Sequence, residues 1–330
     1  MGRKDMQLKY SNTEELLDLY KGLVRVRLVE EKLSDLFSEG EIPGFIHLSN
    51  GQEAVPVGVM AATNQEDTIA STHRGHGHCI AKGLELEGFF GEVLGKESGL
   101  CRGRGGSMHV ADFSKGMLGA NGIVAAGIPL AMGSALAHNR LGSEAIAIAF
   151  FGDGALAEGV LHETLNMSKL LGLPLLFVCE NNGWSEFSKY DHQIKFKSKE
   201  FVSSYGISYE EVDGNNVLAV KHTAEVVINS VRKNSSPYFL ECFTTRQRGH
   251  FEGDGQHYRN DQELAECKER DPLVLTELKL TEMGCDAALI LAVKEEVGKS
   301  IESAVKTARA APDSNFNAAL NGVYSPGETQ

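Results

Sequence analysis

Two polar elements that each follow a short apolar run could together hold a magnesium ion. Gly-Asp-Gly at 152–154 follows the run 145–151, and Asn-Asn at 181–182 comes just after the run 175–179. Such runs predict buried parallel strands, and the segment 158–171 between them predicts a helix. Ligands of open α/β sheets bind at the carboxyl ends of the strands. A carboxylate and a carboxamide placed there suit Mg²⁺ that holds a phosphate group.

A dinucleotide site is the alternative interpretation of the first element. Residues 152–157 also match the pattern G-x-G-x-x-A after a strand, which is typical of NAD-binding enzymes. Asp153 would then put a negative charge where the pyrophosphate must lie, unless a metal ion separates the two. Glu180 could serve the ribose, but the Asn-Asn pair has no role in that interpretation. We therefore favour the magnesium site and keep an NAD-linked dehydrogenase as the alternative.

A second cluster, His-Arg-Gly-His-Gly-His at 73–78, could bind an anion or a metal. Histidines at this spacing would suit zinc, but Arg74 would fix a positive charge beside the ion. Arginine binds phosphate in a fork, and the glycines let backbone N–H groups approach an anion, so we favour the anion site. A plain glycine-rich surface loop is the remaining alternative. His47 and His250 lie in loops beside glycines, and neither alone would justify a catalytic role.

The elements around these clusters predict an α/β fold with a doubly wound, mainly parallel sheet flanked by helices. Two further strands, 209–212 and 238–244, enclose a helix at 217–232, so strands and helices alternate along the chain. The glycine-rich zone 71–121 and the polar segment 249–271 predict long functional loops. Other helices are predicted at 16–37, 52–62, 85–94, 129–138 and 287–311.

The composition excludes several classes of protein. A net charge of −13 argues against general affinity for nucleic acid or anionic membranes. The 6 cysteines are scattered without a CxxC pair, which indicates reduced thiols in a cytoplasmic compartment. No apolar run approaches the length of a membrane span, and the first residues lead us to expect neither a signal nor a transit peptide. We expect a cytoplasmic globular protein.

In this order, the motifs resemble the α subunits of thiamine-diphosphate-dependent dehydrogenases. These are the first components of 2-oxo acid dehydrogenase complexes and of the related acetoin dehydrogenase system. The resemblance extends over about 16–273 and is carried by Gly-Phe-Ile-His-Leu-x-x-Gly-Gln-Glu-Ala, His-Arg-Gly-His-Gly, Gly-Arg-Gly-Gly-Ser-Met-His, Asn-Gly-Ile-Val, Gly-Asp-Gly-Ala, Glu-Asn-Asn and Gly-His-x-x-x-Asp…Tyr-Arg. It implies the thiamine-diphosphate-binding fold over 41–311, with an N-terminal helical arm at 1–40 and a C-terminal tail at 312–330.

The resemblance also implies roles for individual residues. Mg²⁺ would be held by Asp153, the side chain of Asn182 and the main-chain carbonyl of Trp184. His250 would act as proton donor near the reacting carbon, and His47 would line the same cavity. The cofactor thiamine diphosphate would contact His73, Arg74, Gly122, Val124, Asp153, Gly154, Ala155 and Asn182.

The same resemblance predicts partners and a substrate. The glutamate that activates the cofactor lies on the β subunit of such enzymes, so we expect activity only in a heterotetramer of two α and two β chains. The small-residue helix 129–138 suits close packing at that interface, with packing inside the chain as the alternative. His73 stands where pyruvate and branched-chain members commonly have Tyr. We therefore favour acetoin as substrate, cleaved to a two-carbon unit for a lipoyl-bearing component, over pyruvate or a branched-chain 2-oxo acid.

Overall fold

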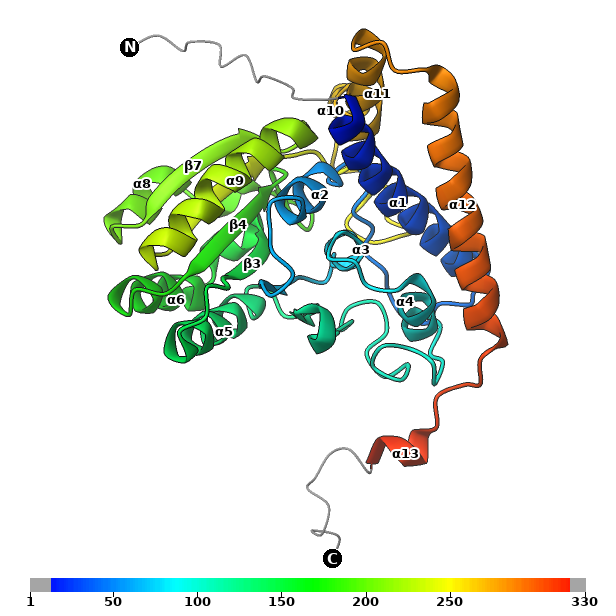
Figure 1. Ribbon diagram of the computed structural model, residues 1–330, viewed down its shortest axis with the longest axis horizontal. Helices are drawn as coiled ribbons and strands as arrows, with labels where there is room; N and C mark the ends of the chain where they lie inside the picture. Colours follow the sequence, from blue (N-terminus) through cyan, green and yellow to red (C-terminus); the bar gives the residue numbers. More distant parts are fainter. Residues whose placement is uncertain (1–12, 321–330) are drawn as a thin grey trace, which may run out of the picture.

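A parallel six-stranded sheet forms the centre of the protein in the computed structural model, which describes residues 13–320 (Figure 1). The strand order is β2-β1-β3-β4-β8-β7, and every neighbouring pair is parallel. The strands are β1 (Thr68–Ala70), β2 (Met117–Gly119), β3 (Ala147–Gly152), β4 (Leu175–Asn181), β7 (Ser208–Asp213) and β8 (Tyr238–Phe243). A short antiparallel pair, β5 (Trp184–Ser185) and β6 (Ser188–Lys189), lies outside this sheet. The predicted fold class is confirmed.

Helices cover both faces of the sheet, because side chains alternate between the two faces along each strand. Ile148 and Phe150 of β3 pack into one apolar cluster, and Ala149 and Phe151 pack into the other. One face carries α5 (Gly127–Leu141), α6 (Gly159–Leu170) and α8 (Ser198–Ser204). The other face carries α2 (Ala54–Met60) and α9 (Val217–Asn234).

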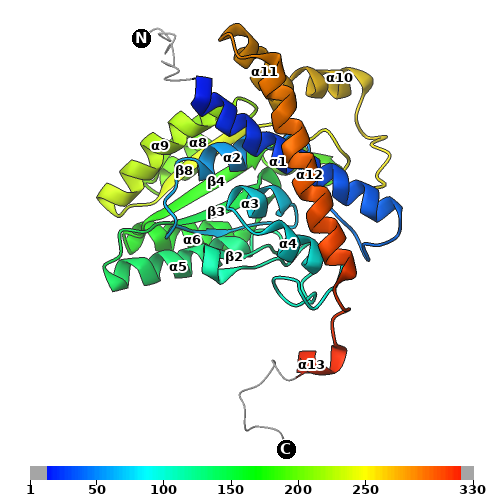
Figure 2. The same ribbon diagram turned by 45° about the vertical axis from the view of Figure 1, so that its right-hand side comes forward.

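A layer of further helices packs outside α2 and α9. Figure 2 shows α12 crossing in front of α1, and the two helices are in contact. The helices of this layer are α1 (Thr13–Ser38), α3 (His76–Ala81), α4 (Leu86–Val93), α11 (Pro272–Glu282) and α12 (Ala287–Ala310). The remaining helices are α7 (Tyr190–Gln193), α10 (Asp261–Glu269) and α13 (Phe316–Leu320). Among the described residues, no helix has both the length and the apolar character needed to cross a membrane.

The two predicted long loops contain more regular structure than expected. The zone 71–121 holds the predicted helix at 85–94, which is α4, and in addition α3, β2 and a short 3₁₀ turn, Phe113–Lys115. The segment 249–271 holds α10, so the prediction of a loop is wrong for its second half. The side chain of Asn260 caps that helix by accepting from the N–H of Glu263, and only Cys267 of the helix is buried. The division of the chain at residues 40 and 311 stays a prediction, and 1–12 and 321–330 lie outside the described part.

Candidate active site

One cavity, of about 390 Å³, opens at the carboxyl ends of β3 and β4. Strand β3 ends at Gly152, and β4 ends at Asn181, so the residues that follow both strands reach the same space. Every site residue expected from the sequence lies on its wall, namely His47, His73, Arg74, Gly122, Val124, Asp153, Gly154, Ala155, Asn182, Trp184 and His250. What these residues bind stays a prediction.

Asp153 is a buried carboxylate without a hydrogen-bond partner. Its side chain is 1% exposed, and neither carboxylate oxygen accepts a hydrogen bond in the described structure. Burial raises the pKa of Asp153 to about 7, and the nearby backbone N–H groups of Asp153 and Asn182 offset only part of that rise. A buried acid in this condition needs a proton or a cation. The environment therefore fits the predicted metal.

Neighbouring residues orient the second predicted metal ligand. The Asn182 side-chain amide donates to Oε1 of Gln52 at 3.1 Å, and its oxygen accepts from the N–H of Trp184 at 3.0 Å. The β5 segment approaches the turn at Gly154 so closely that a Cβ there would lie 2.6 Å from Oγ of Ser185. A larger residue at 154 would therefore require the Ser185 side chain to move. Gln52 and Ser185 also line the cavity, although the sequence analysis did not single them out.

Two buried guanidinium groups lie on the same cavity. Arg74 donates to the carbonyl of Leu48 at 2.6 Å and to that of His250 at 3.0 Å. Arg246 is 2% exposed and donates to the hydroxyl of Tyr258 at 2.9 Å. Burial, together with the charge of Arg246, lowers the pKa of Arg74 to about 9. Neither group forms an ion pair with a carboxylate of the described residues, so this wall favours an anionic ligand.

Arg246 is a site residue that sequence reasoning missed. It follows β8 by three positions, in the polar run Thr-Thr-Arg-Gln-Arg-Gly-His. Its place after a buried strand is the same signal that identified Asp153 and Asn182. Arg248 lies two positions later, and the sequence alone does not show which of these two arginines points into the cavity.

Three histidines from distant segments meet at the cavity. Ring centroids are 4.7 Å apart for His47 and His73, 5.0 Å for His47 and His250, and 5.5 Å for His73 and His250. Burial, and then the charge of Arg74, lowers the pKa of His47 to about 3 and that of His250 to about 4. The same causes hold the pKa of His73 well below its usual value. All three rings are therefore neutral near pH 7 and can exchange protons with a bound molecule.

The zinc alternative at 73–78 is contradicted. His76 bonds to Oε2 of Glu30 at 2.9 Å and to Oγ of Ser107 at 2.7 Å, away from His73. His78 bonds to Oγ of Ser71 at 2.7 Å. The other trio could approach a single ion, since their ligand atoms lie within 4.8 Å of one another. The two buried guanidinium groups oppose a cation at that point.

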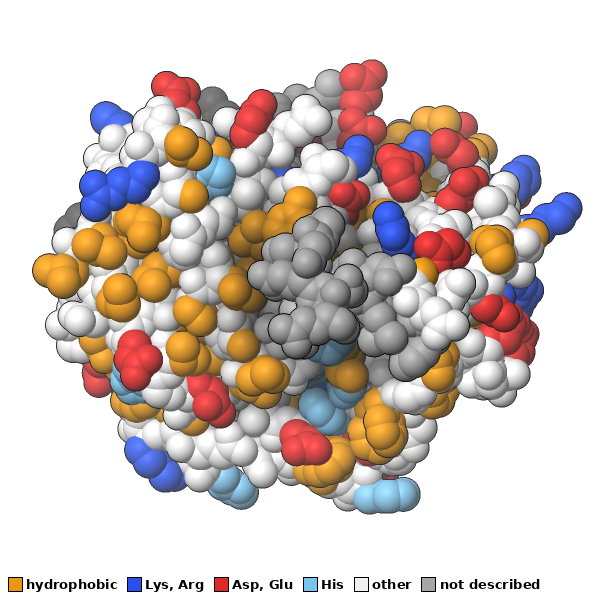
Figure 3. Space-filling view, turned by 90° about the horizontal axis from the view of Figure 1, so that it is seen from below, with side chains coloured by type: hydrophobic (Ala, Val, Ile, Leu, Met, Phe, Trp, Pro, Cys, Tyr) orange, Lys and Arg blue, Asp and Glu red, His pale blue; other side chains and the backbone are white. Residues whose placement is uncertain are grey.

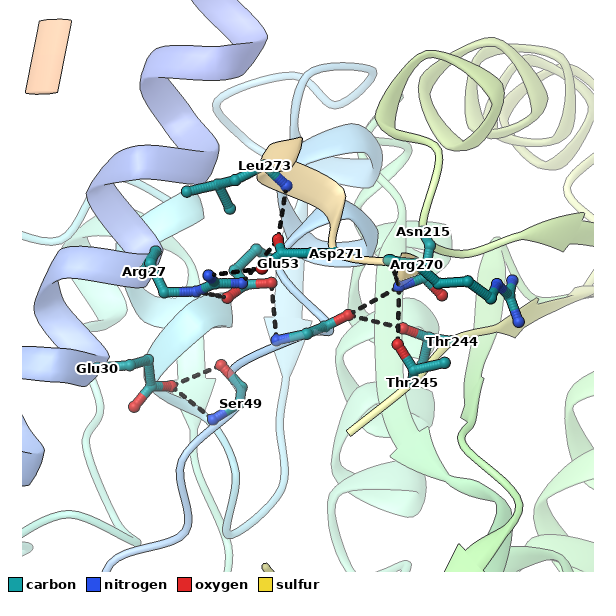
Figure 4. Close-up of polar contacts among 11 residues, drawn as sticks. Arg27, Glu30, Ser49, Glu53, Asn215, Thr244, Thr245, Arg270, Asp271 and Leu273 are labelled. Carbon is teal, nitrogen blue, oxygen red and sulfur yellow. Dashed lines mark hydrogen bonds and ion pairs between the residues drawn. The ribbon is translucent and has the colours of Figure 1, made fainter. Parts of the chain in front are cut away.

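Buried charges fasten the segment that carries His47 and Gln52 (Figure 4). Arg27 of α1 donates to Oε1 of Glu53 at 2.5 Å and grips both carboxylate oxygens of Asp271 at 3.0 and 3.1 Å. The other oxygen of Glu53 accepts from the N–H of Gly51 at 2.9 Å. The arginine thus joins α1, the loop before α2 and the start of α11.

The carbonyl side of Gly51 is held equally firmly (Figure 4). The side-chain amide of the fully buried Asn215 donates to the Gly51 carbonyl at 3.1 Å and to the Arg270 carbonyl at 2.7 Å. A Cβ on Gly51 would lie 2.3 Å from the carbonyl oxygen of Thr245, so the loop touches the segment after β8. That segment continues to His250. The loop that carries His47 and the segment that carries His250 are therefore held together by non-covalent contacts.

Known proteins are similar in sequence to this chain over almost its full length. The profile of the family described as dehydrogenase E1 component matches residues 21–317. The chain is 42% identical to the α subunit of acetoin:2,6-dichlorophenolindophenol oxidoreductase from Bacillus subtilis, over 94% of both chains. Identity to the subunit of the same name from Cupriavidus necator is 44%, again over 94% of both chains. The pyruvate dehydrogenase E1 component subunit alpha of Zymomonas mobilis is 35% identical, over 92% of this chain and 86% of its own. The resemblance inferred from the motifs is thus confirmed, and the chain belongs to the dehydrogenase E1 component family.

Proposed function

We propose that this chain is the α subunit of a thiamine-diphosphate-dependent dehydrogenase that cleaves acetoin. The proposal rests on one observation: groups of opposite charge line the same cavity, and each lacks a partner of opposite charge. Asp153 is a buried carboxylate without a partner, and Arg74 and Arg246 are buried guanidinium groups without a carboxylate. A diphosphate bridged to protein by Mg²⁺ satisfies both demands at once.

The cofactor would be held by residues from several elements. Asp153, the Asn182 side chain and the Trp184 carbonyl would bind Mg²⁺. Arg74 with His73 would bind the diphosphate, and Arg246 extends that set. The remaining contacts would come from the backbone of Gly122 and Val124 and from the turn at Gly154 and Ala155.

Catalytic roles are proposed for two of the neutral histidines. When bound, thiamine diphosphate supplies a carbon nucleophile and an electron sink, which protein side chains lack. Neutral His250 can donate its ring N–H to the substrate oxygen and can accept a proton at its other nitrogen, which the low pKa leaves unprotonated at neutral pH. Its Nδ1 is buried and has no partner in the described structure. His47 stands beside it and lines the same space.

A β subunit would complete the site. Ile123 and Val124 are 72% and 46% exposed, although Val124 is proposed to face the cofactor. Figure 3 shows many apolar side chains on the face of the molecule seen from below. Exposed apolar residues of α5 and α6 include Leu130, Leu141, Met167 and Leu170. Such an apolar surface supports a protein partner, and a lipoyl-bearing component would then receive the two-carbon unit. The free cysteines support a cytoplasmic location.

The test is an assay of the chain co-purified with its β subunit, using 2,6-dichlorophenolindophenol as electron acceptor. Acetoin, pyruvate and branched-chain 2-oxo acids are compared, each with and without thiamine diphosphate and Mg²⁺. We expect the highest kcat/KM with acetoin, and only when both additions are present. A higher value with pyruvate would favour the 2-oxo acid dehydrogenase alternative. Metal-independent binding of NAD without binding of thiamine diphosphate would favour the NAD-linked alternative.

A further inference from the structure

A buried carboxylate, Glu92, lies at the centre of the glycine-rich loop that follows α4. The side chain is fully buried. Its Oε2 accepts from the N–H of Cys101 at 2.6 Å and from that of Gly103 at 2.9 Å. Its Oε1 accepts from the N–H of Gly105 at 2.6 Å and from that of Gly106 at 3.2 Å. Backbone N–H groups from one loop that converge in this way form an anion-binding concavity, filled here by the protein's own side chain.

The glycines of this loop are required by the concavity. A Cβ on Gly105 would lie 2.6 Å from the carbonyl oxygen of His109, and one on Gly99 would lie 2.5 Å from Oε2 of Glu92. Gly103 has φ +68°, a conformation that other residues rarely adopt. Side chains at these positions would push the N–H donors away from the carboxylate. The glycine-rich sequence therefore fits a loop that is folded around Glu92.

The far end of the same loop forms part of the cavity wall. Oγ of Ser107 is hydrogen-bonded to Nε2 of His76 at 2.7 Å. The other ring nitrogen of His76 is hydrogen-bonded to Glu30, so the loop is connected to α1 through buried side chains. Met108 lines the cavity. A Cβ on Gly122 would lie 3.8 Å from the Met108 sulfur, so the two residues are neighbours on that wall.

We infer that Glu92 is a positioning residue for the cofactor cavity. Its charge folds the segment 101–109, and that fold places Met108 beside Gly122. The role in cofactor binding rests on the proposed function. The folding of the loop around Glu92 rests on the four hydrogen bonds alone, so the two parts can be tested separately.

The first test uses the unmodified complex of α and β subunits. Hydrogen–deuterium exchange is followed in peptides that cover 101–106, without added cofactor. We expect slow exchange of the four bonded N–H groups, although Arg102 and Arg104 between them are exposed. Complete exchange of this segment within seconds would overturn the inference, whatever the complex binds.

The second test compares Glu92→Gln with Glu87→Gln in the same complex. Glu87 lies on the same helix and is exposed, so its replacement is the matched control. A glutamine at 92 presents an amide donor to two of the N–H groups. We expect trypsin to cleave after Arg102 or Arg104 at least about tenfold faster in Glu92→Gln, and at the unmodified rate in the control.

The affinity for thiamine diphosphate with Mg²⁺ completes the test. We expect the Kd of Glu92→Gln to rise about tenfold or more, since a displaced wall residue weakens a pre-formed site. Faster cleavage with an unchanged Kd would overturn the positioning role. If Glu92→Gln does not assemble, Glu92→Asp, which keeps the charge but is one methylene shorter, must give the same two changes. An unmodified complex that shows slow exchange but no cofactor binding would instead refute the proposed function.

Discussion

Replacing Asp153 with asparagine should stabilise the cofactor-free protein and abolish its Mg²⁺-dependent binding of thiamine diphosphate. Burial raises the pKa of Asp153 from 3.8 to about 7. One pKa unit corresponds to about 1.4 kcal/mol, so ionising this buried carboxyl costs the metal-free folded state about 4 kcal/mol above pH 7. The amide of an asparagine would lack partners and cost about 1–3 kcal/mol. A net gain of about 1–3 kcal/mol remains.

The sign of the pH dependence follows from the raised pKa. The folded state binds the Asp153 proton more tightly than the unfolded chain does, because burial disfavours the charged form. The contribution of this group to stability is therefore complete below about pH 4 and is lost as the pH rises towards 7. The gain from Asp153→Asn should accordingly appear at pH 8 and vanish at low pH.

Thermal unfolding of the cofactor-free complex at pH 8 and pH 5 measures the effect. We expect a Tm about 5 °C higher for Asp153→Asn at pH 8, and a clearly smaller difference at pH 5. Asp191→Asn, at an exposed position, is the control and should leave Tm unchanged. A Tm that falls at pH 8, or Mg²⁺-dependent cofactor affinity that survives the substitution, would refute this reasoning.

Four further outcomes are expected. In the unmodified complex, the Kd of thiamine diphosphate with Mg²⁺, followed by calorimetry, should rise below pH 7 by up to about tenfold per unit, since protons compete for Asp153. His250→Ala should keep the Kd but lower kcat by about 10²-fold in the dye-reduction assay. Arg246→Met should raise the Kd about 10–100-fold in the same titration, because the variant loses a buried guanidinium that is proposed to bind the diphosphate. Arg232→Met should cost about 3 kcal/mol in urea unfolding with kcat unchanged, because the fully buried Asp67 loses its ion pair at 2.7 Å.

The parts of the fold that the sequence predicted are those with a strong hydrophobic pattern. Strands β3 and β4 are buried on both faces and therefore form continuous apolar runs. Strands β1 and β2 have 3 residues each, too few for a period to appear. Helix α10 buries only Cys267, so its polar sequence resembles a loop. Its cap at Asn260 is the signal that could have revealed it.

The candidate site was predictable where residues directly follow strands. Asp153 and Asn182 could be paired from the strand–helix–strand order alone. That His47 and His250 share a cavity followed only from the family resemblance, because their contact depends on how two loops far apart in the sequence cross the end of the sheet. Glu92 was missed. An acid in an apolar helix gives no sign that its partners are backbone N–H groups.

The contacts of Arg27 with Glu53 and Asp271 have a consequence for folding during synthesis of the chain. The residue that Arg27 grips, Asp271, lies 244 positions later. Ribosomes add about 5–20 residues per second, so the first helix must wait about 12–50 s for that partner. During this time the apolar face of α1, including Leu23 and Leu33, has no complete surface to cover it. The nascent chain should therefore depend on chaperones until α11 and α12 emerge, and truncation before residue 271 should leave an aggregating product.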